Sequence, residues 1–185
     1  GGGPRERPDR GFFRDAKQYG DFLCRLFDRW MAFGPDKLSI RDFDSILTHC
    51  ISGRHTICTF DRQCSQYIVV EHQGDVFPCD FFVEPKWRLG NILETPIEQL
   101  AACASKKAFA RCKSNLATKC LICRHLAVCR GGCMKDRAPF DPDNYGRESY
   151  FCESYRQFFD HAMPRFLQTA AQIRVGALVR PPELT

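Results

Sequence analysis

The chain has 185 residues and a formal net charge of +5, and 44% of its residues are hydrophobic. That length fits one domain, or one domain and part of another, and the apolar content allows a packed core. No apolar run approaches the ~20 residues of a membrane span. The N-terminus lacks the apolar stretch of a secretory signal, and the basic residues form no block typical of nucleic-acid binding. We therefore expect a cytoplasmic protein that binds neither membranes nor nucleic acids.

The first part of the chain predicts helices. Residues 1–10 are rich in Gly, Pro and charge, which predicts a disordered tail. Apolar side chains then recur at three- and four-residue steps over 12–33 and predict an amphipathic helix that ends at Gly34-Pro35. We expect a short strand over 37–41 and a second short helix over 43–51.

The segment 67–79 predicts a β-hairpin. It is rich in β-formers on both sides of Gln73-Gly74, which favours a tight turn at Gly74. Cys64 and Cys79 lie near the two open ends of this hairpin. Their thiols are therefore expected to converge on one site.

The rest of the chain alternates helix and loop. Thr95-Pro96 predicts a helix start with Thr as N-cap, and another helix is expected over 106–112. Residues 113–150 are expected to form loops. A helix beginning at Phe151 should be kinked by Pro164 and end in a frayed tail. Its apolar face consists of Tyr155, Phe158, Phe159, Ala162 and Phe166.

Twelve cysteines are the most informative feature of the sequence. In a chain without a secretion signal, clustered cysteines are more often metal ligands than disulfides. Soft thiolates select zinc, copper(I) or iron–sulfur clusters. Eight cysteines form two groups; the first is Cys58, Cys64 and Cys79, and the second is Cys120, Cys123, Cys129 and Cys133, followed by Cys152.

Spacing alone leaves zinc and iron–sulfur binding open. A zinc ribbon would pair two Cys-x2-Cys knuckles, whereas only Cys120-x2-Cys123 is present. The x5 and x3 gaps that follow are closer to ferredoxin-like runs, in which the fourth cysteine can serve a different cluster. Iron–sulfur clusters are thus favoured over two structural zinc sites. A cluster held by four thiolates carries a charge of roughly −2, so the basic excess would offset two of them.

The cysteine spacing resembles the SPASM domain of radical S-adenosylmethionine (SAM) enzymes. The surrounding sequence resembles, more narrowly, the anaerobic sulfatase-maturating enzymes, from about Tyr19 to Ala162. The motifs that carry the resemblance are Cys64-x9-Gly74-x4-Cys79, Cys79-Asp80-Phe81-Phe82, Lys86-Trp87-Arg88-Leu89-Gly90-Asn91, Cys120-x2-Cys123-x5-Cys129, Cys129-Arg130-Gly131-Gly132-Cys133, Asp136-Arg137 and Cys152.

This resemblance implies an α+β, loop-rich fold in which a β-hairpin and short helices surround two [4Fe–4S] clusters, with longer helices at the flanks. It implies that residues 11–52 are the last elements of a radical SAM barrel. The twin-cluster domain would be 53–160, and 161–185 the end of a helix and a tail. The implied ligands are Cys58, Cys64, Cys79 and Cys133 for the first cluster, and Cys120, Cys123, Cys129 and Cys152 for the second.

The other four cysteines fall outside this ligand pattern. We expect Cys24 and Cys50 to be small buried apolar residues. Cys103 and Cys112 are also expected to be structural, with a spare ligand near the second site as the alternative for Cys112.

The resembled family oxidises an active-site Cys or Ser of a sulfatase to Cα-formylglycine. The resemblance implies that a radical derived from SAM removes a hydrogen from the substrate Cβ and a base removes a proton. An electron then leaves through the clusters, to an external protein such as a ferredoxin or flavodoxin. The implied base is Asp80, although an Asp in this position can also simply cap a turn.

The sequence departs from radical SAM chemistry in one respect. That chemistry, as the resemblance implies it, needs a Cys-x3-Cys-x2-Cys loop, and Asp136 stands where the third cysteine after Cys129 and Cys133 would be needed. We therefore expect SAM, a third [4Fe–4S] cluster and most of a barrel of roughly 200 residues to lie outside this chain, and the chain alone to be inactive. Two other interpretations stay open: a SPASM enzyme acting on other peptides, and a stand-alone zinc or iron–sulfur binding module.

Overall fold

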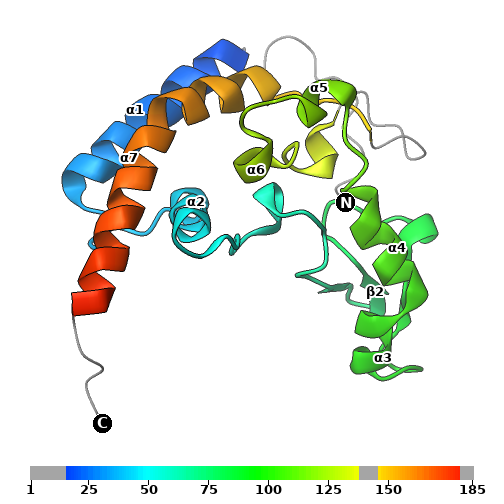
Figure 1. The fold of residues 1–185 in the computed structure, drawn as a ribbon. Helices are drawn as coiled ribbons and strands as arrows, with labels where there is room; N and C mark the ends of the chain where they lie inside the picture. The colour runs from blue at the N-terminus through cyan, green and yellow to red at the C-terminus, as the bar shows by residue number, and fades with distance from the viewer. Residues whose placement is uncertain (1–15, 138–145, 180–185) are drawn as a thin grey trace. The chain divides into compact units, whose positions relative to one another are not determined.

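A computed structural model describes residues 16–137 and 146–179 (Figure 1). The tail predicted at 1–10, the first residues of the helix predicted from residue 12, and the frayed end at 180–185 lie outside the described residues. The chain folds as two compact units. The first unit contains the described residues between 58 and 150, and the second contains those of 14–57 and 151–185.

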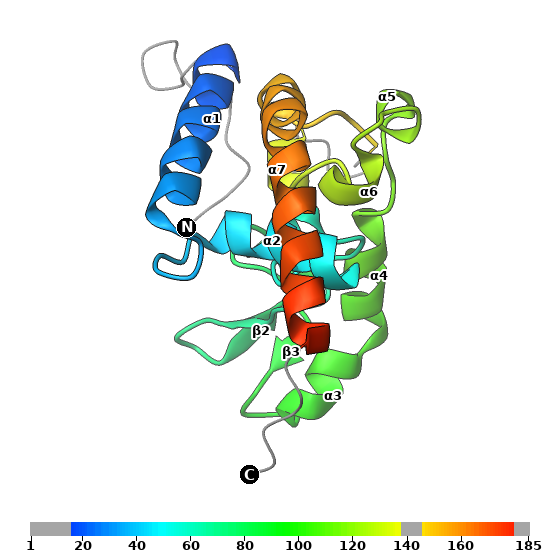
Figure 2. The ribbon, with the colours of Figure 1, turned by 60° about the vertical axis from the view of Figure 1, so that its left-hand side comes forward.

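The second unit is built from three helices, and Figure 2 shows the first of them beside the last. They are α1 (Ala16–Phe33), α2 (Arg41–Ser52) and α7 (Cys152–Val179), and α7 packs against both of the others. The predicted amphipathic stripe explains α1, because its members Leu23, Phe27 and Trp30 are buried. The predicted apolar face of the last helix is buried at every position: Tyr155, Phe158, Phe159, Ala162 and Phe166.

Aromatic rings fill the core of this unit. The ring centroids of Phe27 and Phe166 are 4.7 Å apart, and those of Phe43 and Phe158 are 5.4 Å apart. Trp30 is buried as well, and its indole Nε1 donates a hydrogen bond of 2.7 Å to the carbonyl oxygen of Leu38. Buried aromatic side chains of this kind supply most of the apolar area that stabilises a small helical unit.

The strand predicted over 37–41 is wrong. The backbone N–H groups of Lys37 and Leu38 both bond to the carbonyl of Gly34, so the chain forms a turn there. The Leu38 carbonyl accepts a hydrogen bond from the Trp30 indole. Both backbone groups of Leu38 are therefore satisfied without a neighbouring strand. The helix predicted at 43–51 is confirmed as α2.

The last helix runs unbroken through Pro164 and begins one residue after the predicted Phe151. Figure 1 shows α7 changing direction along its length, which agrees with a kink at a proline. Among the part of the chain that the structure describes, no helix is long and apolar enough to cross a membrane.

The first unit contains the predicted hairpin and a strand that the sequence did not reveal. Strands β1 (Val69–Val70) and β2 (Asp75–Phe77) pair antiparallel, and Gly74 takes φ +88° in the turn between them. Strand β3 (Gly90–Asn91) pairs antiparallel with β2 on its other side. The Asn91 side chain fixes this third strand, because its Nδ2 donates to Asp75 Oδ1 at 2.9 Å and to the Gln73 carbonyl at 3.0 Å.

Short helical segments complete the first unit. The helices predicted near 97 and 106–112 are confirmed, but the N-cap of the former is Pro96, one residue after the expected Thr95. The region 113–150 was expected to be loop, and its described part instead holds three helical turns. The segments are η1 (Cys58–Phe60), η2 (Pro85–Trp87), α3 (Ile97–Ala102), α4 (Ala104–Cys112), α5 (Thr118–Leu121), α6 (Leu126–Cys129) and η3 (Met134–Asp136).

Candidate metal centre

Four cysteines of the first unit, from four different segments, form one neighbourhood. Cys58 begins η1, Cys64 follows that turn, Cys79 follows β2, and Cys133 precedes η3. Cys64 and Cys133 are buried, and the charge of each would act on the other. Cys58 acts on both of these, and Cys79 is acted on by Cys133. These four are the ligand set that the resemblance implies for the first cluster.

An apolar cluster supports this neighbourhood. Cys64 packs with Phe82, Trp87, Phe109 and Met134, and the partly buried Cys79 lies against the same group. The ring centroids of Trp87 and Phe109 are 4.9 Å apart. Burial of this kind fixes the backbone on either side of the thiols, so their positions depend on packing as well as on any bound metal.

Burial also favours the protonated thiols of Cys64, Cys79 and Cys133 when no metal is bound. Desolvation raises the pKa of Cys64 to about 12, although the nearby Lys113 opposes the shift. Desolvation likewise raises the pKa of Cys79 to about 12, with the Asp80 carboxylate adding to it. It also raises the pKa of Cys133. Thiolates form at such a site only when a cationic metal or cluster replaces the protons.

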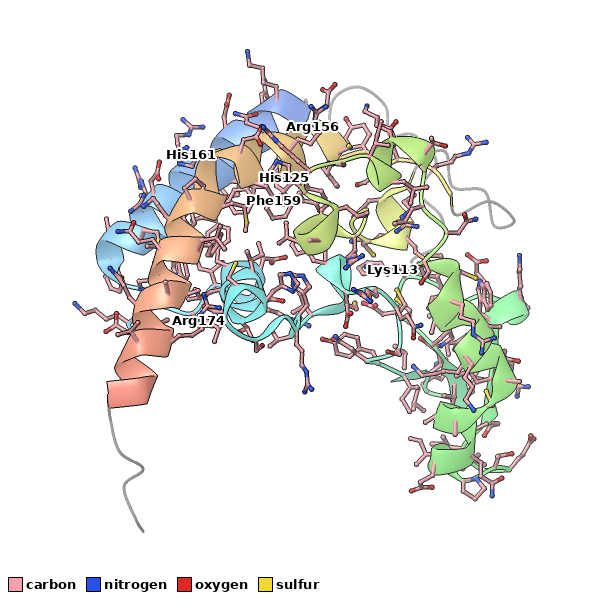
Figure 3. All side chains as sticks on the ribbon, in the orientation of Figure 1. Lys113, His125, Arg156, Phe159, His161 and Arg174 are labelled. Carbon is pink, nitrogen blue, oxygen red and sulfur yellow. The ribbon has the colours of Figure 1, made fainter. Side chains whose placement is uncertain are left out.

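Three buried cations surround the thiols, and sequence reasoning missed two of them. Lys106, Lys113 and Arg137 are 5%, 1% and 2% exposed. The Lys113 ammonium donates to the carbonyls of Cys58 and Thr59, and Figure 3 shows where Lys113 lies, at the end of α4. A lysine near the end of a helix gives no sequence signal of burial, whereas Arg137 was singled out within Asp136-Arg137.

The ionisable acidic neighbours of these cations are cysteines. Desolvation lowers the pKa of Lys113, and the groups that oppose this are Cys64, Cys133 and Cys58. For Lys106 the opposing groups are Cys64, Cys79 and Cys103. Buried cations are costly unless negative charge compensates them. Four thiolates around an iron–sulfur core would supply about two negative charges here, so the residues fit such a group.

In the described ranges, no three His, Cys, Asp or Glu side chains are gathered closely enough to hold a single metal ion. The four thiolates around a four-iron core stand farther apart than four ligands around one zinc ion, whose sulfurs each lie about 2.3 Å from the metal. The thiols can therefore be electrostatic neighbours without converging on one point.

The second predicted ligand set lies partly in the first unit. Cys120 is in α5, Cys123 follows it, and Cys129 ends α6. Backbone bonds from Cys123 to the Cys120 carbonyl at 3.1 Å and from Cys129 to the His125 carbonyl at 2.8 Å hold this stretch in tight turns. The fourth predicted ligand, Cys152, is the first residue of α7 and belongs to the second unit.

The turn between Cys129 and Cys133 explains its Arg-Gly-Gly sequence. Arg130, Gly131 and Gly132 all have positive φ, at 49°, 75° and 66°. A Cβ on Gly131 would lie 2.9 Å from Leu116 Cδ2 and 3.0 Å from Arg137 Nη2. Gly131 is therefore required both by its backbone conformation and by the close approach of the Arg137 guanidinium.

Asp80, the predicted base, lies beside a predicted ligand. Its exposed carboxylate accepts a hydrogen bond of 3.4 Å from Cys79 Sγ. The backbone N–H of Phe82 bonds to the Cys79 carbonyl at 3.1 Å, which forms a turn around Asp80. The geometry thus allows both interpretations of Asp80, a base next to a metal centre and a residue within a turn.

The remaining cysteines have ordinary structural surroundings. Cys103 precedes α4, where its Sγ accepts a 3.4 Å bond from the Lys106 N–H and acts as the N-cap. Cys112 packs against the apolar cluster, and its Sγ donates to the Ala108 carbonyl at 3.4 Å. Cys24 and Cys50 are only partly buried, and both lie in the second unit.

Known proteins match a domain within the first unit and, more broadly, most of the chain. Residues 58–125 match the SPASM family, described as an iron–sulfur cluster-binding domain. A cysteine-type anaerobic sulfatase-maturating enzyme of Clostridium perfringens is 34% identical over 85% of this chain and 43% of its own length. A serine-type anaerobic sulfatase-maturating enzyme of Bacteroides thetaiotaomicron is 34% identical over 83% of this chain and 37% of its own length.

A solved structure is also similar to most of this chain. Native anSMEcpe with bound AdoMet and Cp18Cys peptide superposes with a TM-score of 0.83 at 32% identity, over 93% of this chain and 48% of that one. The chain belongs to the anaerobic sulfatase-maturating enzyme family, as a portion that carries its SPASM domain. This agrees with the C-terminal portion expected from the sequence. The chain spans less than half the length of the curated relatives it matches.

The structural similarity confirms the predicted α+β fold. The family match identifies residues 58–125 as an iron–sulfur cluster-binding domain. The cysteine-type and serine-type relatives match at the same identity.

Proposed function

We propose that this chain is the auxiliary-cluster portion of an enzyme that oxidises a sulfatase Cys or Ser to Cα-formylglycine. In this proposal it binds two [4Fe–4S] clusters. The names of its relatives support the substrate class. The observation that carries the proposal is the group of four thiols, Cys58, Cys64, Cys79 and Cys133, set among the buried cations Lys106, Lys113 and Arg137.

The chain's own residues would have two tasks. Thiolates of the first set would hold one cluster, which when bound supplies a one-electron acceptor. Cys120, Cys123, Cys129 and Cys152 remain the predicted ligands of the second. Asp80 would take the proton that the substrate loses on oxidation, at a carboxylate 3.4 Å from the Cys79 sulfur. Base and acceptor would then be adjacent, so the proton and the electron could leave from one place.

Metal analysis tests the cluster proposal. The chain would be loaded with iron and sulfide without oxygen, and iron and zinc counted per chain. Two clusters require about eight iron atoms, and Cys64→Ser or Cys123→Ser should each remove about half of them. Cys24→Ser is the matched control and should keep them all. Two zinc ions and no iron after anaerobic purification would reject the proposal in favour of structural zinc sites.

A chimera tests the role of Asp80. This chain would replace the matching portion of the Clostridium perfringens enzyme, and the chimera would be expressed with a sulfatase. Asp80→Asn should keep the iron content and abolish formylglycine detected by mass spectrometry, whereas Asp61→Asn should leave both unchanged. Formylglycine at the unsubstituted level in the Asp80→Asn chimera would assign Asp80 to the turn alone.

A further inference from the structure

The buried side chain of Arg137 bonds to four backbone carbonyls of the first unit. Its guanidinium donates to the carbonyl oxygens of Asn115 at 2.8 Å, Lys113 at 3.0 Å, Arg130 at 3.2 Å and Gly131 at 3.3 Å. The side chain is 2% exposed. These bonds join the segment after α4 to the turn between Cys129 and Cys133. The charge is therefore fixed in place by backbone atoms.

Arg137 lies near cysteines of both predicted ligand sets. Its guanidinium bonds to the carbonyls of Arg130 and Gly131, in the turn that joins Cys129 of the second set to Cys133 of the first. Its charge would therefore act on Cys133 and Cys64 of the first set and on Cys129 and Cys120 of the second. Lys113 differs, because the thiols that it interacts with, Cys58, Cys64 and Cys133, all belong to the first set. The Arg137 guanidinium bonds to the backbone carbonyl of Lys113, whereas the Lys113 ammonium bonds to the carbonyls of Cys58 and Thr59, beside the first set alone.

A fixed positive charge changes the reduction of a nearby cluster in a definite direction. The reduced cluster carries one more negative charge than the oxidised one, so a cation stabilises the reduced form and raises the potential. Burial strengthens the effect because the surroundings screen charge less than water does. Arg keeps its charge in proteins, so the effect does not depend on its protonation.

Resting on the proposed binding of two clusters, we propose that Arg137 is a positioning residue that raises the reduction potentials of both clusters together, whereas Lys113 raises that of the first cluster alone. Arg137 then makes both clusters easier to reduce without changing the difference between their potentials. Lys113 adds a bias toward an electron resting on the first cluster, beside Asp80.

Potentiometry of the whole loaded chain tests this assignment. Iron per chain is counted, and the reduction of each cluster is followed by electron paramagnetic resonance in a redox titration. Arg137→Gln should shift the equilibrium of both clusters toward the oxidised form by at least tenfold, which is about 59 mV for a one-electron couple. Lys113→Met should shift one cluster only. Arg137→Lys, which keeps the charge, and the exposed Arg111→Gln should leave both near the unsubstituted values.

Each result supports or overturns the proposal. Arg137→Gln with full iron content and unchanged potentials, or a shift of one cluster only, overturns it. If Arg137→Gln takes up no iron, Arg137→Lys decides: loading with unchanged potentials supports control by charge, and failure to load assigns Arg137 a purely structural role. Uptake of a single cluster by the unsubstituted chain overturns the shared role, and uptake of no iron instead rejects the proposed function.

Discussion

The two units of this chain are stabilised by different means. In the second unit, α1, α2 and α7 bury a continuous set of aromatic rings, including Phe27, Trp30 and Phe43. In the first unit, short segments surround cysteines and buried cations, and the apolar cluster is smaller. Packing alone can sustain the second unit. The first contains buried charge that packing does not compensate, so its stability should depend on what its thiols bind.

Removal of iron should have the largest effect, because it should destabilise the first unit and leave the second unit folded. Chelation from the loaded chain would leave Lys106, Lys113 and Arg137 buried beside neutral thiols, so the described residues of the first unit should lose most of their protection from hydrogen exchange. Amides of α1, α2 and α7 should keep theirs. Exchange measured by mass spectrometry before and after chelation tests this. Loss of protection in both units would show that the second unit also depends on bound iron.

Truncation of one ring in the second unit should have the converse effect. Phe27 has no exposed surface and lies 4.7 Å from Phe166, centroid to centroid. Phe27→Ala should lower the free energy of unfolding by about 3–5 kcal/mol, measured in denaturant, with iron content unchanged. Phe33→Ala, at a position 57% exposed, is the control and should change it by less than about 0.5 kcal/mol. Loss of iron in Phe27→Ala would contradict the prediction.

Two glycines with the same φ, one in each unit, separate the cost of backbone conformation from the cost of side-chain crowding. Gly53 and Gly131 both have φ +75°, but a Cβ on Gly53 meets nothing within 4 Å, whereas one on Gly131 meets Leu116 and Arg137. Gly53→Ala should cost roughly 1–2 kcal/mol for the left-handed conformation and leave iron binding intact. Gly131→Ala should cost more and lower the iron content. Equal iron content in the two variants would show that the turn tolerates displacement of Arg137.

The smallest expected effect concerns Cys103. Its thiol caps α4 as a weak acceptor, so Cys103→Ala should lower the free energy of unfolding by about 0.5 kcal/mol, and Cys103→Ser should restore it. Iron per chain should stay unchanged in both. A loss of iron in Cys103→Ser would place this cysteine among the ligands.

Features with a clear period or a specific turn could be read from the sequence. The stripe of α1, the apolar face of α7 and the hairpin at Gly74 each follow from local patterns. Strand β3 could not, because two residues carry no alternation and the strand depends on bonds from Asn91. The turn at Lys37 likewise involves a side chain, because the indole of Trp30 donates to the Leu38 carbonyl.

The candidate site was predictable in its cysteines but not in its charges. Spacing and motif assigned eight thiols to two sets, and in the structure the four of the first set are electrostatic neighbours. Burial of Lys106 and Lys113 depends on how α4 packs, and nothing in their sequence neighbourhood distinguishes them from solvated lysines. The charge balance of the site therefore became visible only in three dimensions.

The electrostatic neighbourhood of Cys133 with Cys58 and Cys64 has a consequence for biosynthesis. A chain made from its N-terminus emerges with Cys58, Cys64 and Cys79 long before Cys133, and Cys120, Cys123 and Cys129 appear in between. A cluster delivered too early would meet three thiols of one set and then three of the other. With the proposed ligand sets, correct assembly favours delivery after synthesis has passed residue 133 for the first cluster and residue 152 for the second, or a carrier that withholds its cargo until the fourth thiol of each set is present.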